Sequence, residues 1–134
     1  MSYLTLVASV EAGEMEKAVL LDAMLCATKV YNGLIWELRQ EYEQTGKSRV
    51  SRQNLNRILK ELPRAQGYYS LSVRATRDEV IGAYRSYFGL RRNGNQEARP
   101  PGFRRKTRYS GLRYFNGYGL KVDGDCLRLG LGLK

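Results

Sequence analysis

An apolar stripe between about residues 14 and 45 constrains the fold of this 134-residue chain more than any other feature. Apolar side chains recur at steps of three or four, which predicts a long helix from about Glu14 to Thr45 with one buried side. Glu14 and Glu16 stand at its start, where the helix dipole favours negative charge. Gly46 follows as a stop signal. The stripe consists of Leu20, Met24, Ala27, Tyr31, Leu34, Leu38 and Tyr42.

Two shorter helices are expected next. One starts at Ser51, runs to about Leu62 and is ended by Pro63. The other starts at about Tyr69 or Ser72, runs to Phe88 and is closed by Gly89. Their apolar stripes are Leu55, Ile58, Leu59 and Leu62, and Tyr69, Val73, Val80, Tyr84 and Tyr87.

Both ends of the chain have the pattern of β-strands. Tyr3–Val10 alternates between polar and wholly apolar positions, as a half-buried strand requires. Three more strands are expected at Thr107–Phe115, Tyr118–Val122 and Cys126–Leu133. The turn pairs Asn116-Gly117 and Asp123-Gly124 join them.

The order is therefore one strand, three helices, and three more strands. The simplest closure pairs the first strand with the last ones, which gives an α+β fold. We expect a small antiparallel β-barrel of the oligonucleotide-binding type from residues 1–12 and 100–134. Residues 13–99 would form a helical domain inserted after the first strand.

Charge is distributed unevenly along the chain. The net charge is +10, but residues 1–46 carry −4, residues 47–90 carry +6 and residues 91–134 carry +8. A gradient of this kind suggests one face for a polyanion and another for packing or partners. The hydrophobic content of 43% indicates a globular chain, large enough for a hydrophobic core.

The two cysteines, Cys26 and Cys126, lie one hundred residues apart, and the chain has no histidine. This excludes a Cys/His metal site within the chain, so we expect no metal and no cofactor. Both cysteines are expected to be reduced and buried in a cytoplasmic protein. No signal peptide and no apolar run long enough to cross a membrane is apparent.

The stretch from Arg91 to Lys121 carries nine Lys or Arg against one acid, Glu97, with aromatic residues interleaved. Cations neutralise phosphates and aromatic rings stack on bases, so the stretch indicates nucleic-acid binding. The alternative is a solvated loop and an ordinary edge strand. The candidate phosphate contacts are Arg91, Arg92, Arg99, Arg104, Arg105, Lys106, Arg108 and Arg113. The candidate stacking residues are Tyr109, Tyr114 and Phe115, of which about half would point inward.

Four groups of residues, in order, resemble the N-terminal part of the TnpB proteins of insertion-sequence transposons, the relatives of type V CRISPR effector nucleases. Tyr31-Asn32 with Leu34 resembles a motif in the first helix of that family. Ala83-Tyr84 with Tyr87-Phe88 resembles one that closes a later helix. The other two groups are Pro101-Gly102-Phe103-Arg104-Arg105-Lys106, and the strands at residues 119–124 and 127–134.

The resemblance implies a wedge domain of the barrel type with an inserted helical recognition domain. Such a part grips the guide RNA, the guide–target duplex and a short DNA motif beside the target. The implied partners are guide RNA, target DNA and a nuclease-domain subunit or the rest of a longer chain. The expected location is the cytoplasm of a prokaryote, at the nucleoid, in a protein of host or phage origin. Guesses for helical contacts to the motif or heteroduplex are Asn54, Asn56, Arg74 and Arg77.

The family's RuvC-type nuclease uses separated carboxylates and is followed by a Cys-rich zinc segment, and the resemblance reaches neither. The carboxylates Asp123 and Asp125 flank Gly124 and have the character of turn residues, whereas two-metal chemistry needs several converging carboxylates. We therefore expect this chain to bind nucleic acid without cutting it. A generic RNA- or single-strand-DNA-binding barrel is the alternative. A small independent enzyme is disfavoured, because no histidine and no nucleophile–base pair is visible.

Overall fold

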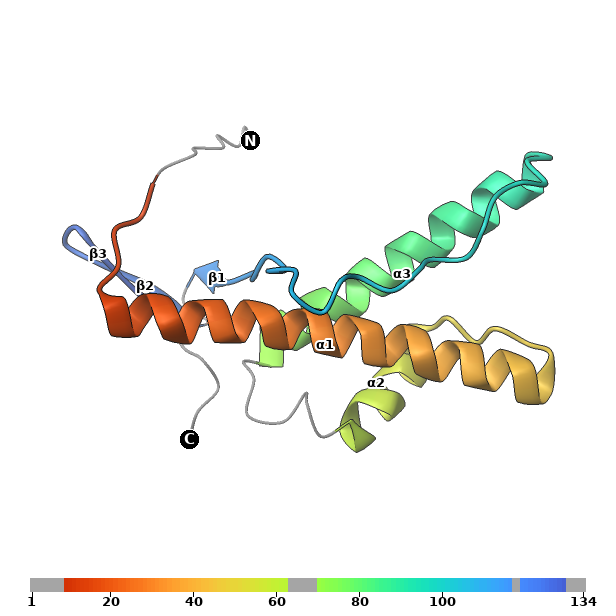
Figure 1. The fold of residues 1–134 in the computed structure, drawn as a ribbon, viewed down its shortest axis with the longest axis horizontal. Helices are drawn as coiled ribbons and strands as arrows, with labels where there is room; N and C mark the ends of the chain where they lie inside the picture. Colours follow the sequence, from red (N-terminus) through yellow and green to blue (C-terminus); the bar gives the residue numbers. More distant parts are fainter. Residues whose placement is uncertain (1–8, 63–69, 117–118, 130–134) are drawn as a thin grey trace.

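The computed structural model describes residues 9–62, 70–116 and 119–129. The elements follow in the order α1, α2, α3, β1, β2 and β3. Figure 1 shows the long helix α1 as the axis of the molecule, with α2 and α3 beside its later turns and the strands near its earlier turns. The helices are α1 (Glu14–Thr45), α2 (Arg52–Glu61) and α3 (Ser70–Arg92). The strands are β1 (Phe115–Asn116), β2 (Gly119–Asp123) and β3 (Cys126–Leu129).

Helix α1 confirms the predicted bounds at both ends. Gly46 adopts a left-handed conformation (φ 73°) and its N–H is bonded to the Tyr42 carbonyl oxygen, which stops the helix. The core forms along its middle turns, where Leu34 and Ile35 are fully buried. The two ends of the predicted stripe are less buried than expected, and Tyr42 is 57% exposed. Residues buried on α1 are Ala27, Thr28, Val30, Tyr31, Leu34, Ile35 and Leu38.

Helix α2 also follows its prediction. The Ser51 side chain accepts a hydrogen bond from the Asn54 N–H and caps the N-terminus. Leu55 and Ile58 are buried and complete the core with Val80 of α3. Pro63 lies outside the described residues.

Helix α3 continues past the predicted end at Phe88, to Arg92. Gly89 stays helical, because glycine can adopt helical backbone angles, although at a cost relative to other residues, and does not by itself end a helix. The chain turns at Gly94, which has φ 90°. Two predicted phosphate-binding residues, Arg91 and Arg92, therefore lie in the last turn of a helix, where the dipole favours positive charge.

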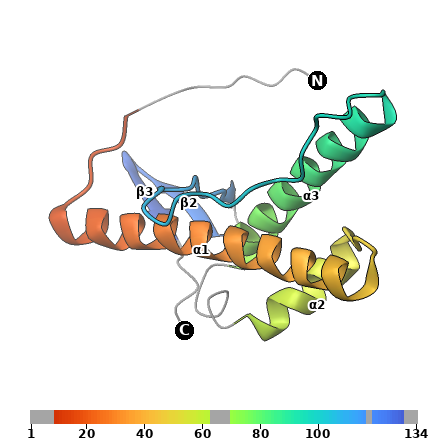
Figure 2. The ribbon, with the colours of Figure 1, turned by 45° about the vertical axis from the view of Figure 1, so that its right-hand side comes forward.

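Residues 95–114, here called the return segment, run back from the end of α3 towards the strands (Figures 1 and 2). The strand predicted at Thr107–Phe115 is wrong for all but its last residue. A hydrogen bond joins the Ser110 N–H to the Met24 carbonyl oxygen of α1 (3.2 Å), in place of a partner strand. Extended backbone in this segment is therefore held by a helix.

The predicted α+β fold with a closed barrel is also wrong, because the described residues are mostly helical and form only a small open sheet. Among the described residues, β2 and β3 form an antiparallel hairpin in which Val122 pairs with Leu127, and β1 adds two residues in parallel to β2. Val122 and Leu127 are both exposed, so no second layer of described residues covers them. Among the described residues the sheet does not close, because the return segment is bonded to α1 and contributes no strand.

The other predictions, for two turns, the first strand and the cysteines, are confirmed only in part. The turn at Asp123-Gly124 is confirmed, with Gly124 at φ 63°. The hairpin at Asn116-Gly117 is wrong for the described part, since β1 and β2 are parallel, and Gly117 lies outside that part. Most of the strand predicted at Tyr3–Val10 lies outside it too, and Ser9 and Val10 are irregular. Cys126 is exposed and Cys26 half-buried, so the expectation that both are buried is wrong.

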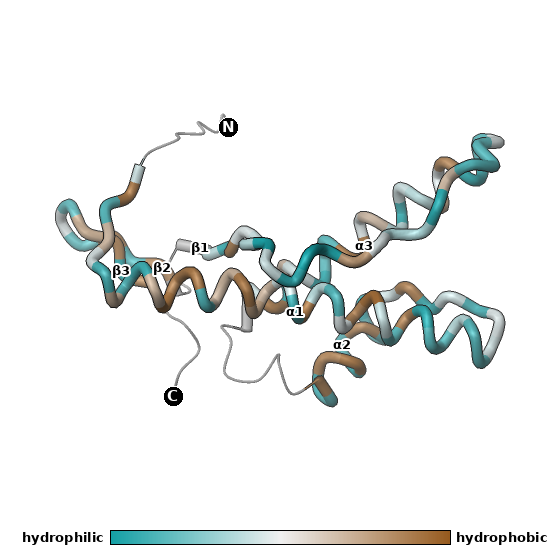
Figure 3. Tube along the Cα trace, viewed as in Figure 1, coloured by the Kyte–Doolittle hydropathy of each residue, from teal (hydrophilic) through white to brown (hydrophobic). Residues whose placement is uncertain are grey.

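Helix α1 is long and apolar enough, by length and composition alone, to cross a membrane, which differs from the expectation that no such run exists. Figure 3 shows apolar residues recurring along α1. The core helix of a soluble protein meets the same criteria, and 39% of the apolar window is buried inside this molecule. The helix is thus weak evidence for a membrane span.

Candidate nucleic-acid interface

The return segment is fastened to one side of α1 by polar side chains, in antiparallel order. The Asn32 side chain pairs with both backbone groups of Arg104, accepting from its N–H at 2.8 Å and donating to its carbonyl oxygen at 2.9 Å. One turn earlier, the Thr28 hydroxyl donates to the Arg108 carbonyl oxygen at 2.6 Å. Because that donation uses the only proton of Thr28, the Ser110 hydroxyl donates to Thr28. Thr28 and Asn32 lie one turn apart on the helix, so they bind the return segment on both sides of the turn between Arg105 and Arg108.

Arg104 points inward from the return segment. Its guanidinium donates to Glu79 of α3 at 2.9 Å and to the Ser110 hydroxyl at 3.1 Å. It also lies 3.7 Å above the centre of the Tyr31 ring, in cation–π geometry. The side chain is only 18% exposed. The structure thus places this predicted phosphate contact in a joint between α1, α3 and the return segment.

The remaining cations of the segment point outward. Arg105 and Arg108 flank a turn in which the Arg108 N–H is bonded to the Arg105 carbonyl oxygen at 3.0 Å. Within the part of the chain that the structure describes, their side chains make no ion pair or hydrogen bond. Exposed side chains that share this condition are Arg92, Arg99, Arg105, Lys106, Arg108 and Arg113. Arg91 is exposed as well, and donates to the Gln96 carbonyl oxygen at 3.0 Å.

An open hollow of about 580 Å³ lies between α1 and the return segment. Tyr31 and Arg104 are the most buried residues that line it. Phe103, which is 50% exposed, and the exposed Arg105 and Arg108 form the rest of its wall together with Gly102. The hollow therefore combines two aromatic rings with three guanidinium groups. Figure 3 shows that much of the return segment is hydrophilic.

The predicted stacking residues have different environments. Tyr109 is 51% exposed, and Tyr114 is half-buried. The side chain of Phe115 lies outside the described part. Neither Tyr109 nor Tyr114 lines the hollow, whereas Phe103 does. Sequence reasoning included Phe103 in the basic stretch but did not single it out, although the Pro100-Pro101-Gly102 turn before it was a signal that the chain direction is fixed there.

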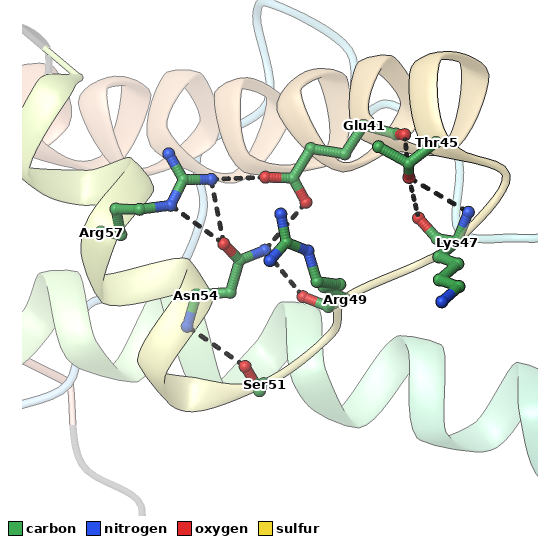
Figure 4. Close-up of polar contacts among 7 residues, drawn as sticks. All are labelled: Glu41, Thr45, Lys47, Arg49, Ser51, Asn54 and Arg57. Carbon is green, nitrogen blue, oxygen red and sulfur yellow. Dashed lines mark hydrogen bonds and ion pairs between the residues drawn. The ribbon is translucent and has the colours of Figure 1, made fainter.

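The predicted contacts on the helices are mostly used for packing. Asn54 accepts from Arg57 and donates to Glu41 and to the Arg49 carbonyl oxygen, which ties α2 to α1 (Figure 4). Arg57 also pairs with Glu41. The same close-up shows Thr45 bonded to the backbone of Lys47 at the end of α1.

Arg77 is buried at 6% exposure and donates to Asn56 at 2.7 Å, beside an ion pair with Asp78. Arg74 is exposed on α3. The four guesses are therefore not brought together as one outward-facing site. A second open hollow, of about 700 Å³, borders α2, and Asn54, Asn56 and Arg57 line part of it.

No three His, Cys, Asp or Glu side chains gather as metal ligands would in the ranges that the structure covers. Burial raises the pKa of Tyr84, and the nearby Arg39 charge partly offsets this rise. Neither observation identifies a catalytic group.

Comparison with protein-family models, with curated proteins and with solved structures finds no match. The resemblance to the TnpB family thus stays a prediction from the quoted motifs.

Proposed function

We propose that this protein is a non-catalytic nucleic-acid-binding module that contacts phosphates through the outer side of its return segment. One observation carries the proposal: six exposed cations in and beside the segment have no described partner, while the backbone beneath is fixed to α1. Fixed, unpaired cations neutralise phosphates without first breaking internal ion pairs.

In its specific form, the proposal is the nucleic-acid-gripping part of an RNA-guided, TnpB-like DNA-targeting system in the prokaryotic cytoplasm. The quoted motifs support this form, and its partners would be guide RNA, target DNA and a nuclease-bearing subunit or segment. A general RNA- or single-strand-binding role is the alternative, and the same outer cations would serve it.

The test compares two triple charge reversals. Arg105→Glu with Lys106→Glu and Arg108→Glu removes the cations of the turn. Lys17→Glu with Lys29→Glu and Lys47→Glu makes the same charge change at exposed positions on α1 and just after its end. Arg104 is left intact, because its reversal would break the ion pair with Glu79. We expect the first variant to bind a labelled structured RNA at least tenfold more weakly at about 0.1 M salt, and the second to bind nearly as wild type. Equal losses in both variants would contradict the proposed surface.

Sequencing of the RNA that co-purifies with the protein separates the two forms. The guided form predicts one structured RNA, encoded near the gene, and weaker binding to a scrambled RNA of the same length. A mixture of unrelated cellular RNAs, bound as tightly as the scrambled control, would contradict the guided form and favour the general one.

A further inference from the structure

Phe103 is held as a rigid ring at the wall of the 580 Å³ hollow. The Arg39 guanidinium lies 4.5 Å from the ring centre and covers one face. Arg39 also donates to the Pro101 carbonyl oxygen at 3.1 Å, so the same side chain fixes the turn that precedes the ring. Half of Phe103 remains exposed, and the residue lines the hollow. A ring that is already held by one contact loses little freedom when a second flat group stacks on it.

Three consecutive residues have different environments. Arg104 is bonded to Glu79 and its side chain is mostly buried, whereas its neighbours Phe103 and Arg105 are exposed. The turn that follows brings Arg108 back beside Arg105, since the first and last residues of such a turn lie close together. Both guanidinium groups consequently border the hollow that Phe103 walls.

We infer that this hollow holds one unpaired nucleotide of the bound nucleic acid, with its base stacked on Phe103 and its phosphates at Arg105 and Arg108. The inference rests on the proposed function and adds the form of nucleic acid that the surface selects. A base within a duplex is already stacked on both faces, so only an unpaired base can use the ring. Arginine beside an aromatic ring adds cation–π and charge contacts to such a site.

The experiment measures binding of the full chain to a labelled mixed-sequence 12-nucleotide single strand, as RNA and as DNA, and to the duplexes of the same sequences. Phe103→Ala is expected to bind the single strands about tenfold more weakly. Its affinity for the duplexes and the salt dependence of binding should match wild type, because no charge is changed. Tyr109→Ala is the matched control, since Tyr109 is equally exposed but does not line the hollow. A loss with Tyr109→Ala and none with Phe103→Ala would overturn the inference.

A second readout does not depend on the stability of Phe103→Ala. The chain has one tryptophan, Trp36, which is exposed on α1. In the variant Trp36→Phe with Phe103→Trp, the only indole stands at the hollow. Stacking predicts that its fluorescence is quenched by the single strand but not by an abasic strand of equal length. Equal effects of both strands would mean that phosphate contacts alone occupy the site, and would overturn the inference.

The two proposals fail in different ways. If wild type binds neither single strands nor duplexes, the proposed function is wrong and the inference falls with it. If wild type binds with strong salt dependence but Phe103→Ala behaves as wild type, only the stacked nucleotide is wrong.

Discussion

The inner and outer sides of the return segment have the same kind of residues in opposite environments. On the inner side, Arg104 is bonded to Glu79 and Ser110 and stacked on Tyr31. On the outer side, Arg105 and Arg108 are exposed and make no described side-chain bond. Neighbouring arginines thus serve the fold in one case and are available to a ligand in the other.

The difference shows that a count of cations overestimates a binding surface. Of the eight predicted phosphate contacts, Arg104 is engaged in the joint and Arg91 supports the loop after α3. A guanidinium that already bridges a carboxylate and a hydroxyl would have to give up those bonds to meet a phosphate. The outer cations have no such bonds to give up when they meet a phosphate.

The largest expected effect is on the inner side. Arg104→Ala removes an ion pair, a hydrogen bond and a cation–π contact from a mostly buried joint, and leaves Glu79 without its partner. We expect the free energy of unfolding to fall by about 3 kcal/mol. Arg105→Ala should stay within about 0.5 kcal/mol of wild type. Urea denaturation measures both, and similar stabilities for the two variants would contradict the division into inner and outer sides.

Asn32→Ala tests whether a side chain replaces the missing strand partner. Both the N–H and the carbonyl oxygen of Arg104 lose their bonds, and both are partly buried. The expected loss is about 2 kcal/mol. Asn93→Ala makes the same substitution at an exposed position and serves as the control. Unchanged stability of Asn32→Ala would mean that water satisfies these groups and that Asn32 does not hold the segment.

Thr28→Val probes the same attachment with almost no change in shape. The hydroxyl of Thr28 is buried and is bonded to the Arg108 carbonyl oxygen and to Ser110. Its removal should cost about 1 kcal/mol and increase amide hydrogen exchange at residues 108–110. An equal increase of amide hydrogen exchange in α2 would mean that the whole fold is destabilised, and would contradict a local role of Thr28 in holding the segment.

The smallest effect concerns pH. Burial raises the pKa of Tyr84 above its ordinary value of 10.0, so the folded state holds the phenol proton more tightly than the unfolded state. The stability linked to this group is therefore present below pH 10 and is lost as pH rises through the folded pKa. Between about pH 9 and pH 11, Tyr84→Phe should lose less stability than wild type. Parallel curves for the two proteins would contradict the raised pKa.

The helices could be predicted because their signals are local. The stripe through Leu34 and Leu38, the Ser51 cap and Gly46 each act within a few residues, and the structure agrees at these points. The end of α3 was missed because Gly89 tolerates helix as well as a turn, and the stop is at Gly94.

The return segment could not be predicted from its own composition. Residues 107–114 have strand-forming side chains, but extended backbone forms a strand only when another strand is available. Here the hydrogen bonds come from α1, about eighty residues earlier, as in the Thr28–Arg108 pair. The signal in the sequence was a polar pair, Thr28 and Asn32, one turn apart and adjacent to the apolar stripe residues Ala27 and Tyr31.

The attachment to α1 accompanies the inward contact of Arg104 with Glu79, and the turn that follows Arg104 leaves Arg105 and Arg108 exposed. The composition indicated a basic surface. The observed contacts show which of its cations are already bonded within the fold and which remain available to a phosphate. Phe103 lies beside Arg105 and Arg108 in the hollow and Tyr109 does not, a difference that composition alone could not show.

The most direct test of these roles is the salt dependence of binding to one labelled RNA. The slope of log K against log salt concentration reports how many phosphates the protein neutralises. We predict that Arg105→Ala with Lys106→Ala and Arg108→Ala reduces the slope by about two to three, while Lys17→Ala with Lys29→Ala and Lys47→Ala leaves it unchanged. Equal slopes for wild type and both variants would show that the outer side of the return segment does not contact phosphates.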